Sequence, residues 1–114
     1  MIKLFPDGSR HYFNIDGQLH RENGPAIDSP SVKEWLQNGK HHRTDGPAII
    51  KANGYKAWYQ NGTLHRVDGP AIENVHGSKF WYLNGKHHRE DGPAVERADG
   101  SKEYWINDER VEPF

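Results

Sequence analysis

The sequence contains no cysteine, and this absence excludes a whole group of chemistries. Without thiols the chain has no disulfide framework, no thiolate nucleophile and no cysteine metal site, and it fits a reducing compartment. The N-terminal stretch "MIKLFPDGSRHYF" also lacks an apolar run long enough for a signal peptide or a membrane span. We therefore expect a cytoplasmic protein with no transmembrane segment.

Apolar residues and net charge are both scarce. Hydrophobic residues make up 33% of the chain and the mean hydropathy is −1.03, which alone would indicate disorder. Four Trp, five Tyr and four Phe argue against disorder, because such large side chains favour burial, so we predict one folded domain over residues 1–114 with a thin aromatic core. Fifteen basic residues against sixteen acidic ones leave no overall field that would attract double-stranded nucleic acid.

An internal repeat organises the chain. His-Arg pairs begin at residues 20, 42, 65 and 88, so the spacings are 22, 23 and 23 residues. The clearest copy reads "GSKFWYLNGKHHREDGPAVERAD". A fixed short period is the signature of stacked repeat units. The units cover about residues 8–30, 31–53, 54–76, 77–99 and 100–114.

Each unit is predicted to form β-strands and turns. "SKFWYL" is rich in aromatic residues and ends on Asn84-Gly85, a strong two-residue hairpin signal. "KHHRE" would return beside it, and Asp91-Gly92-Pro93 would interrupt the strand that follows. All twelve glycines fall at three positions of the unit, which we interpret as turn positions. No window has the periodicity of an amphipathic helix.

Stacking of the units would give a continuous structure. One repeat position holds Trp35, Trp58, Trp81 and Tyr104, with Tyr12 or Phe13 in the first unit, and stacked units would place these side chains in a ladder. We predict an all-β fold: an elongated, twisted antiparallel sheet, or β-solenoid, of about 4.5 hairpin repeats. Its length would be roughly 45–65 Å.

The frame W-x-x-N-G-K-x-H-R-x-D-G-P-A, which recurs from about residue 7 to residue 108, resembles the MORN repeat in a variant form. The resemblance implies stacked β-hairpins and roles in scaffolding, self-association, protein binding and phosphoinositide contact, with no catalytic role for the repeats. Close variants are similar to small phage and bacterial proteins, some classed with antitoxins. That similarity implies an inhibitor of a host protein, present in the host cytoplasm.

The His-Arg pairs allow two interpretations. Arginine forks and protonated histidines could hold phosphate groups. Alternatively, each arginine pairs with an aspartate in a structural ladder formed with Asp45, Asp68 and Asp91, which is the simpler interpretation because arginine and aspartate recur together. The candidate ligand-binding residues are His41, His42, Arg43, His65, Arg66, His87, His88 and Arg89.

His41 and His87 depart from the repeat, because Leu19 and Leu64 hold the same position in other units. Adjacent histidines on a strand point to opposite faces, which is poor geometry for joint metal ligation. We therefore expect no metal site and no cofactor.

A second basic row also has two interpretations. Its members are Arg10, Lys33, Lys56, Lys79 and Lys102, two residues before the main aromatic position. Such a row could hold single-stranded nucleic acid or a nucleotide, or it could be a solvated edge that discourages aggregation.

Two functions remain open at this point. The first is a non-enzymatic protein-interaction module that binds another protein, or a second copy of itself through the terminal stretches "MIKLF" and "INDERVEPF". The second is a binder of a small anionic ligand, such as a nucleotide or a phosphorylated head group, through the His/Arg or Lys/aromatic ladders. We do not expect an enzyme.

Overall fold

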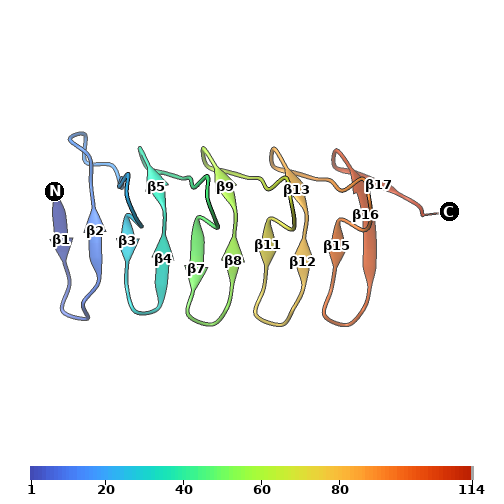
Figure 1. The fold of residues 1–114 in the computed structure, drawn as a ribbon, viewed down its shortest axis with the longest axis horizontal. Helices are drawn as coiled ribbons and strands as arrows, with labels where there is room; N and C mark the ends of the chain where they lie inside the picture. Colours follow the sequence, from blue (N-terminus) through green and yellow to red (C-terminus); the bar gives the residue numbers. More distant parts are fainter. Residues whose placement is uncertain (114) are drawn as a thin grey trace.

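The computed structural model describes residues 1–113, so Phe114, the last residue of the fifth unit, lies outside it. The predicted all-β fold is confirmed: one open antiparallel sheet of 11 strands runs the length of the molecule (Figure 1). Its strands, in spatial order, are β1 (Ile2–Leu4), β2 (Arg10–Tyr12), β3 (Ile27–Asp28), β4 (Val32–Glu34), β7 (Ile49–Lys51), β8 (Lys56–Ala57), β11 (Ile72–Glu73), β12 (Lys79–Phe80), β15 (Val95–Glu96), β16 (Lys102–Ile106) and β17 (Glu109–Val111).

Three short hairpins accompany the main sheet. They are β5 (Leu36–Gln37) with β6 (Lys40–His41), β9 (Tyr59–Gln60) with β10 (Thr63–Leu64), and β13 (Tyr82–Leu83) with β14 (Lys86–His87).

In the second, third and fourth units the expected aromatic strand is interrupted at its tryptophan, whereas β16 of the fifth unit is continuous. In the fourth unit, the predicted strand from Ser78 to Leu83 is divided into β12 and β13 by Trp81. The backbone N–H of Trp81 still donates to the carbonyl of Ala94 in the main sheet, at 2.8 Å. The next residue, Tyr82, instead pairs with His87 inside the hairpin. The tryptophan therefore marks the point where the chain leaves the main sheet.

The Asn-Gly turns explain why the hairpins close so tightly. Asn38, Asn61 and Asn84 have φ of 50–51°, and the glycines that follow them have φ of 79–81°. Positive φ at both central residues defines a type I′ turn, whose twist matches that of the two flanking strands.

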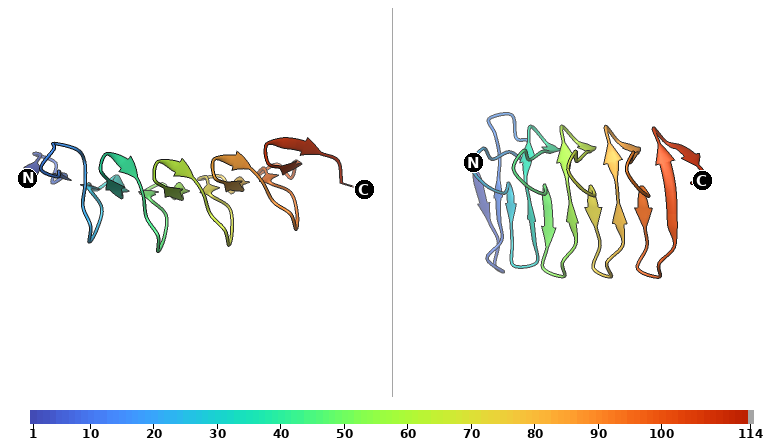
Figure 2. Two further views of the ribbon diagram at one scale, coloured as in Figure 1. Left: turned by 90° about the horizontal axis from the view of Figure 1, so that it is seen from above. Right: turned by 45° about the vertical axis from the view of Figure 1, so that its right-hand side comes forward.

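The units follow one another along the long axis of a molecule that measures 54 × 26 × 18 Å, within the predicted length. The two ends of the chain lie at opposite ends of the array (Figure 1). The Asn-Gly hairpins lie along one side of the array, and successive units have nearly the same orientation (Figure 2). None of residues 1–113 belongs to a helix, so no helix of the described chain could cross a membrane.

The prediction of an aromatic core is wrong, because the most deeply buried side chains are small. The four alanines of the Gly-Pro-Ala segments are fully buried: Ala26, Ala48, Ala71 and Ala94. The four aromatic ladder residues are only half-buried: Trp35, Trp58, Trp81 and Tyr104. Ala71 shows the reason. Its carbonyl accepts from Trp58 at 2.7 Å and its N–H donates to Phe80 at 2.7 Å, so it lies between two strands that carry large rings. We infer that a methyl group is what fits there.

Candidate functional site

The arginine of each His-Arg pair lies over the aromatic ring of its own unit. The guanidinium carbon is 3.8 Å from the ring centroid in the pairs Arg43–Trp35 and Arg66–Trp58. In the pairs Arg89–Trp81 and Arg21–Tyr12 it is 4.0 Å away. Each pair is a cation–π contact. The last pair identifies Tyr12, and not Phe13, as the ladder residue of the first unit.

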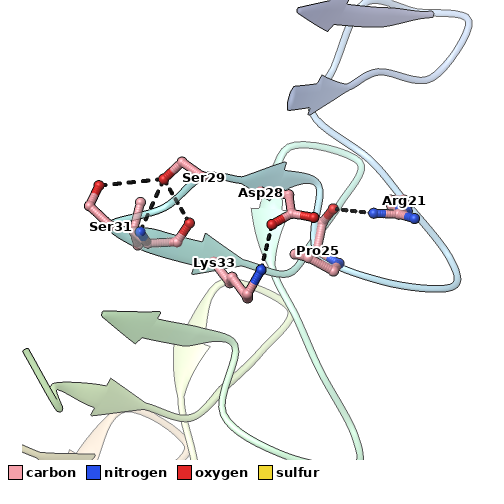
Figure 3. A network of polar contacts seen from close by, with 7 residues as sticks. Arg21, Pro25, Asp28, Ser29, Ser31 and Lys33 are labelled. Atoms are coloured by element: carbon pink, nitrogen blue, oxygen red, sulfur yellow. Dashed lines mark hydrogen bonds and ion pairs between the residues drawn. The ribbon is translucent and has the colours of Figure 1, made fainter. Parts of the chain in front are cut away.

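Two nitrogens of Arg43, Arg66 and Arg89, and one nitrogen of Arg21, are committed to partners inside the chain. In three units Nε donates to the aspartate two residues on, at 2.9–3.1 Å: Arg43 to Asp45, Arg66 to Asp68 and Arg89 to Asp91. Nη1 donates to the proline carbonyl four residues on, at 3.0–3.2 Å, in all four units: Arg21 to Pro25 (Figure 3), Arg43 to Pro47, Arg66 to Pro70 and Arg89 to Pro93. The structure therefore contains the Arg–Asp pairing of the structural interpretation. We call each arginine, with the aromatic ring and the proline carbonyl that it contacts and with the aspartate where one is present, a rung.

The glycine of the Asp-Gly-Pro segment belongs to the rung for a reason that the sequence analysis missed. Gly46, Gly69 and Gly92 do not have positive φ, so they are not needed for a turn. A Cβ atom at Gly69 would lie 2.9 Å from the Cζ atom of Arg66. The guanidinium is thus held between the tryptophan ring and the glycine backbone, where any side chain at this position would intrude.

The histidine of each pair connects one unit to the next. Its Nδ1 atom accepts the backbone N–H of the turn asparagine of the following unit at 2.9–3.1 Å: His20 from Asn38, His42 from Asn61, His65 from Asn84 and His88 from Asn107. An accepting Nδ1 requires that the hydrogen of the neutral ring lies on Nε2. These histidines are therefore oriented by the fold.

Six of the eight predicted ligand-binding residues are thus held by bonds within the chain: His42, Arg43, His65, Arg66, His88 and Arg89. The Arg43 guanidinium, through its hydrogen bond and then its charge, lowers the pKa of the Asp45 carboxyl below its usual value. Within residues 1–113 the Nη2 groups of these arginines donate to no other group. These groups are not fully buried.

The other two predicted residues, His41 and His87, lie in different surroundings. Nε2 of His41 is 2.7 Å from a carboxylate oxygen of Glu34, and the imidazole stacks on Tyr59 at 5.2 Å. The ring of His87 lies between Tyr82 and Trp105, with centroid distances of 4.3 and 5.2 Å. These residues connect rings of neighbouring units and are not brought together with the rungs.

A group of tyrosines near His41 and His87 was not identified from the sequence. Burial, followed by the neighbouring charge of Tyr59, raises the pKa of Tyr55. Burial, followed by the charges of Asp108, Tyr59 and Tyr55, raises the pKa of Tyr82. The phenols of Tyr55 and Tyr82 are therefore protonated and uncharged at neutral pH.

Three equivalent crevices open between the loops of adjacent rungs. We call them crevices A, B and C in chain order, and each has a volume of about 590–640 Å³. Each is lined by the arginine of one unit and by the tryptophan, the following hairpin residue, the histidine and the arginine of the next. In crevice A these residues are Arg21, Trp35, Gln37, His42 and Arg43, in crevice B Arg43, Trp58, Gln60, His65 and Arg66, and in crevice C Arg66, Trp81, Leu83, His88 and Arg89.

The crevices are nearly balanced in charge, and their rims are acidic. Crevice B, for example, contains Arg43 and Arg66 with Asp45 and Asp68. The arginine side chains are about one-fifth exposed, at 21–23%, whereas the aspartates are 83–87% exposed. A ligand that approaches the crevices meets the carboxylates first.

The second basic row lies across the main sheet and not at its edge. In the strand pairing, Asp28 stands between Arg10 and Lys33, Glu73 between Lys56 and Lys79, and Glu96 between Lys79 and Lys102. Lys33 donates to Asp28 at 2.6 Å (Figure 3). Ile50 stands between Lys33 and Lys56, so only three acids alternate with the five bases and the row keeps an excess of positive charge.

No group of three or more metal-ligating side chains occurs in the described chain, residues 1–113. Comparisons of the chain with protein-family models, with curated proteins and with solved structures found no match.

Proposed function

We propose that this chain is a non-enzymatic protein-interaction module of the cytoplasm, and that the face with the three crevices binds the partner. The observation that carries the proposal is the threefold repetition of one set of lining side chains along a single array of hairpins and loops. A rigid array that presents equivalent sites at regular intervals suits an extended partner, because little conformational entropy is lost on binding.

The distribution of hydrogen-bond donors argues against catalysis. Each His-Arg pair recurs with the same internal partners, so no copy is distinguished from the others as a nucleophile, base or acid. Catalytic sites instead bring together different groups in one place.

The same observations argue against the alternative of a small anionic ligand. Nε and Nη1 of Arg43, Arg66 and Arg89 are already engaged, and exposed aspartates form the rim that an anion would have to pass. Like charges at that distance oppose binding.

The resemblance to MORN variants supports a protein partner, and in a phage setting that partner would be a host protein in the host cytoplasm. Self-association through β1 or β17 is the competing outcome.

A site-specific cross-linking experiment tests the proposal. A photoreactive amino acid is placed at Gln60, which lines crevice B, and in a matched variant at Val75, an exposed residue outside the crevices. In the cells that produce the protein, we expect an adduct with another protein from position 60 and none from position 75. The purified partner should then form a complex of defined stoichiometry, measured by light scattering. Equal adducts from both positions, or adducts between two copies of the chain alone, would contradict the proposal.

A further inference from the structure

The repeat distance of the crevices indicates what kind of segment they bind. We propose that the partner contributes a proline-rich segment in the polyproline II conformation, which lies along crevices A, B and C with every third residue seated in one crevice. This inference rests on the proposed protein-interaction function and names the chemistry of the partner.

The first argument is the match of periods. The main sheet advances two strands per unit, and neighbouring strands are about 4.8 Å apart, so adjacent crevices are about 9.6 Å apart. A polyproline II helix rises about 3.1 Å per residue with three residues per turn, or about 9.3 Å per turn. Over the two intervals between crevices A and C the mismatch is only about 0.6 Å.

The second argument is the match of directions. Successive units have nearly the same orientation (Figure 2). Because equivalent residues line the three crevices, we infer that the crevices face nearly the same way. In polyproline II, residues i, i+3 and i+6 also point the same way. A β-strand covers a similar distance in three residues, but residues i and i+3 then point to opposite faces. In an α-helix residues i and i+7 return to one face only after about 10.5 Å, so the mismatch over the same two intervals would be about 1.8 Å.

The third argument is complementary hydrogen bonding. The backbone of polyproline II has no internal hydrogen bonds, so its carbonyl groups need donors when water is excluded. Each crevice supplies the Nη2 group of its rung arginine, and crevices A and B add the Nε2–H groups of His42 and His65, whose Nδ1 atoms are occupied. In crevice C, Nε2 of His88 lies 3.8 Å from a carboxylate oxygen of Glu90. Crevices A and B add the side-chain amides of Gln37 and Gln60. The tryptophan of each crevice offers the aromatic surface on which proline-rich segments pack.

The balance of charge favours an uncharged ligand chain. Two arginines and two aspartates line crevice B, so neither an acidic nor a basic residue gains by entering it. Crevice C differs, because Leu83 replaces the glutamine that lines crevices A and B. We therefore expect a larger apolar residue in crevice C, which would fix the direction of the bound segment.

Binding of synthetic peptides measured by titration calorimetry tests the inference. The probes are capped (Pro-Pro-Ala)n peptides of three, six and nine residues, and the nine-residue peptide built from D-amino acids serves as the matched control. Each added triplet reaches one more crevice, so we expect affinity to rise about tenfold or more per triplet. The D-peptide has the same composition and the opposite helical hand, so it should not bind.

Two blocked variants locate the binding. Gln60→Trp fills crevice B and separates A from C, whereas Gln37→Trp fills crevice A and leaves two adjacent crevices open. The nine-residue peptide should therefore bind Gln60→Trp about as weakly as the three-residue peptide binds the unmodified chain. It should bind Gln37→Trp like the six-residue peptide. Thermal melting of both variants checks their folding, and the length series on the unmodified chain tests the inference without them.

Several results would overturn the inference: equal binding of the L- and D-peptides, affinity that does not depend on length, or binding of a neutral oligosaccharide such as chitohexaose with none of the peptides. If the peptides fail while the Gln60 cross-link to a protein persists, this inference is wrong and the proposed function stands. If the cross-link also fails, both are wrong.

Discussion

The first and third rungs have the same design but different partners. Arg66 lies over Trp58, donates to Asp68 and to the carbonyl of Pro70, and also reaches Glu73 at 3.2 Å. Arg21 lies over a tyrosine and donates to the carbonyl of Pro25, but Asn23 replaces the aspartate.

The comparison separates the essential parts of a rung from the additional ones. The ring, the proline carbonyl and the close glycine are present in both rungs, and the carboxylates are present only in the third. The arginine adopts the same position over the ring in each case. We infer that stacking and the carbonyl bond position the arginine, and that the ion pair adds to a geometry already set.

Removal of the arginine should have the largest effect. Arg66→Ala exposes the tryptophan ring and leaves both the Pro70 carbonyl and the Glu73 carboxylate without their hydrogen-bond donor. We expect the free energy of unfolding to fall by about 2–3 kcal/mol. Arg21→Ala should cost about 1–2 kcal/mol, because no carboxylate loses a partner. Urea unfolding followed by tryptophan fluorescence measures both, and Lys86→Ala, at an exposed position outside the second basic row, is the control. Equal losses in the two rungs would show that the carboxylates contribute nothing.

The close glycine gives the next largest effect. Gly69→Ala would place a methyl group 2.9 Å from the Cζ atom of Arg66, so the guanidinium must move off the ring. We expect a loss of about 2 kcal/mol, typical of overpacking. The double variant Arg66→Ala with Gly69→Ala supplies the control. Without the guanidinium the added methyl group meets no obstacle, so the second substitution should then cost little. A cost that is the same in both backgrounds would contradict the proposed contact.

Acid should weaken the second rung more than the first. The pKa of Asp45 is lowered in the folded protein, so its carboxylate stabilises the fold above the usual pKa of an aspartate. This contribution is lost as the pH falls below that value toward the lowered pKa. Thermal melting of the unmodified chain should therefore decline between pH 5 and pH 3, roughly the range of aspartate titration, and Asp45→Asn should decline less. Asp16→Asn, at an exposed turn residue without an ion-pair partner in residues 1–113, should match the unmodified chain.

The smallest effect is a gain. Asn23→Asp supplies the carboxylate that the first rung lacks, beside an Nε group that has no partner within residues 1–113. Because the site is exposed, the ion pair should add no more than about 0.5 kcal/mol. A melting temperature unchanged at low salt would show that the stacked arginine gains nothing from a carboxylate.

Much of the fold could be predicted from the sequence, because it depends on local signals. The spacing of the His-Arg pairs gives the repeat, and Asn84-Gly85 gives the hairpin through its tolerance of positive φ. The pairing of Arg89 with Asp91 needs only two residues of separation, so it was also within reach.

The remaining features depend on contacts between residues that are distant along the chain. The stacking of Arg66 on Trp58 needs the hairpin to fold back. The division of the aromatic strand at the tryptophan depends on the hydrogen bond from the backbone N–H of the tryptophan to the carbonyl of a buried alanine. One signal for the packing was present in the sequence. A glycine and an alanine come three and five residues after the rung arginine in all four full units, as Gly69 and Ala71 do after Arg66. The opening glycine of the unit, in contrast, is replaced by Ser31 in the second unit. Positions that permit only the smallest side chains indicate close contact.

The bonds that join the units reach only the next unit. The amide of Arg66 donates to the carbonyl of Tyr82, and the amide of Asn84 donates to His65. Stability therefore accumulates interface by interface, so a central unit, held on both sides, should exchange its amide hydrogens more slowly than a terminal one. The valency of the molecule, meaning the number of crevices it offers to one continuous ligand, is then set by the number of units. A duplication or loss of 23 residues would change that number by one without redesign of any other site.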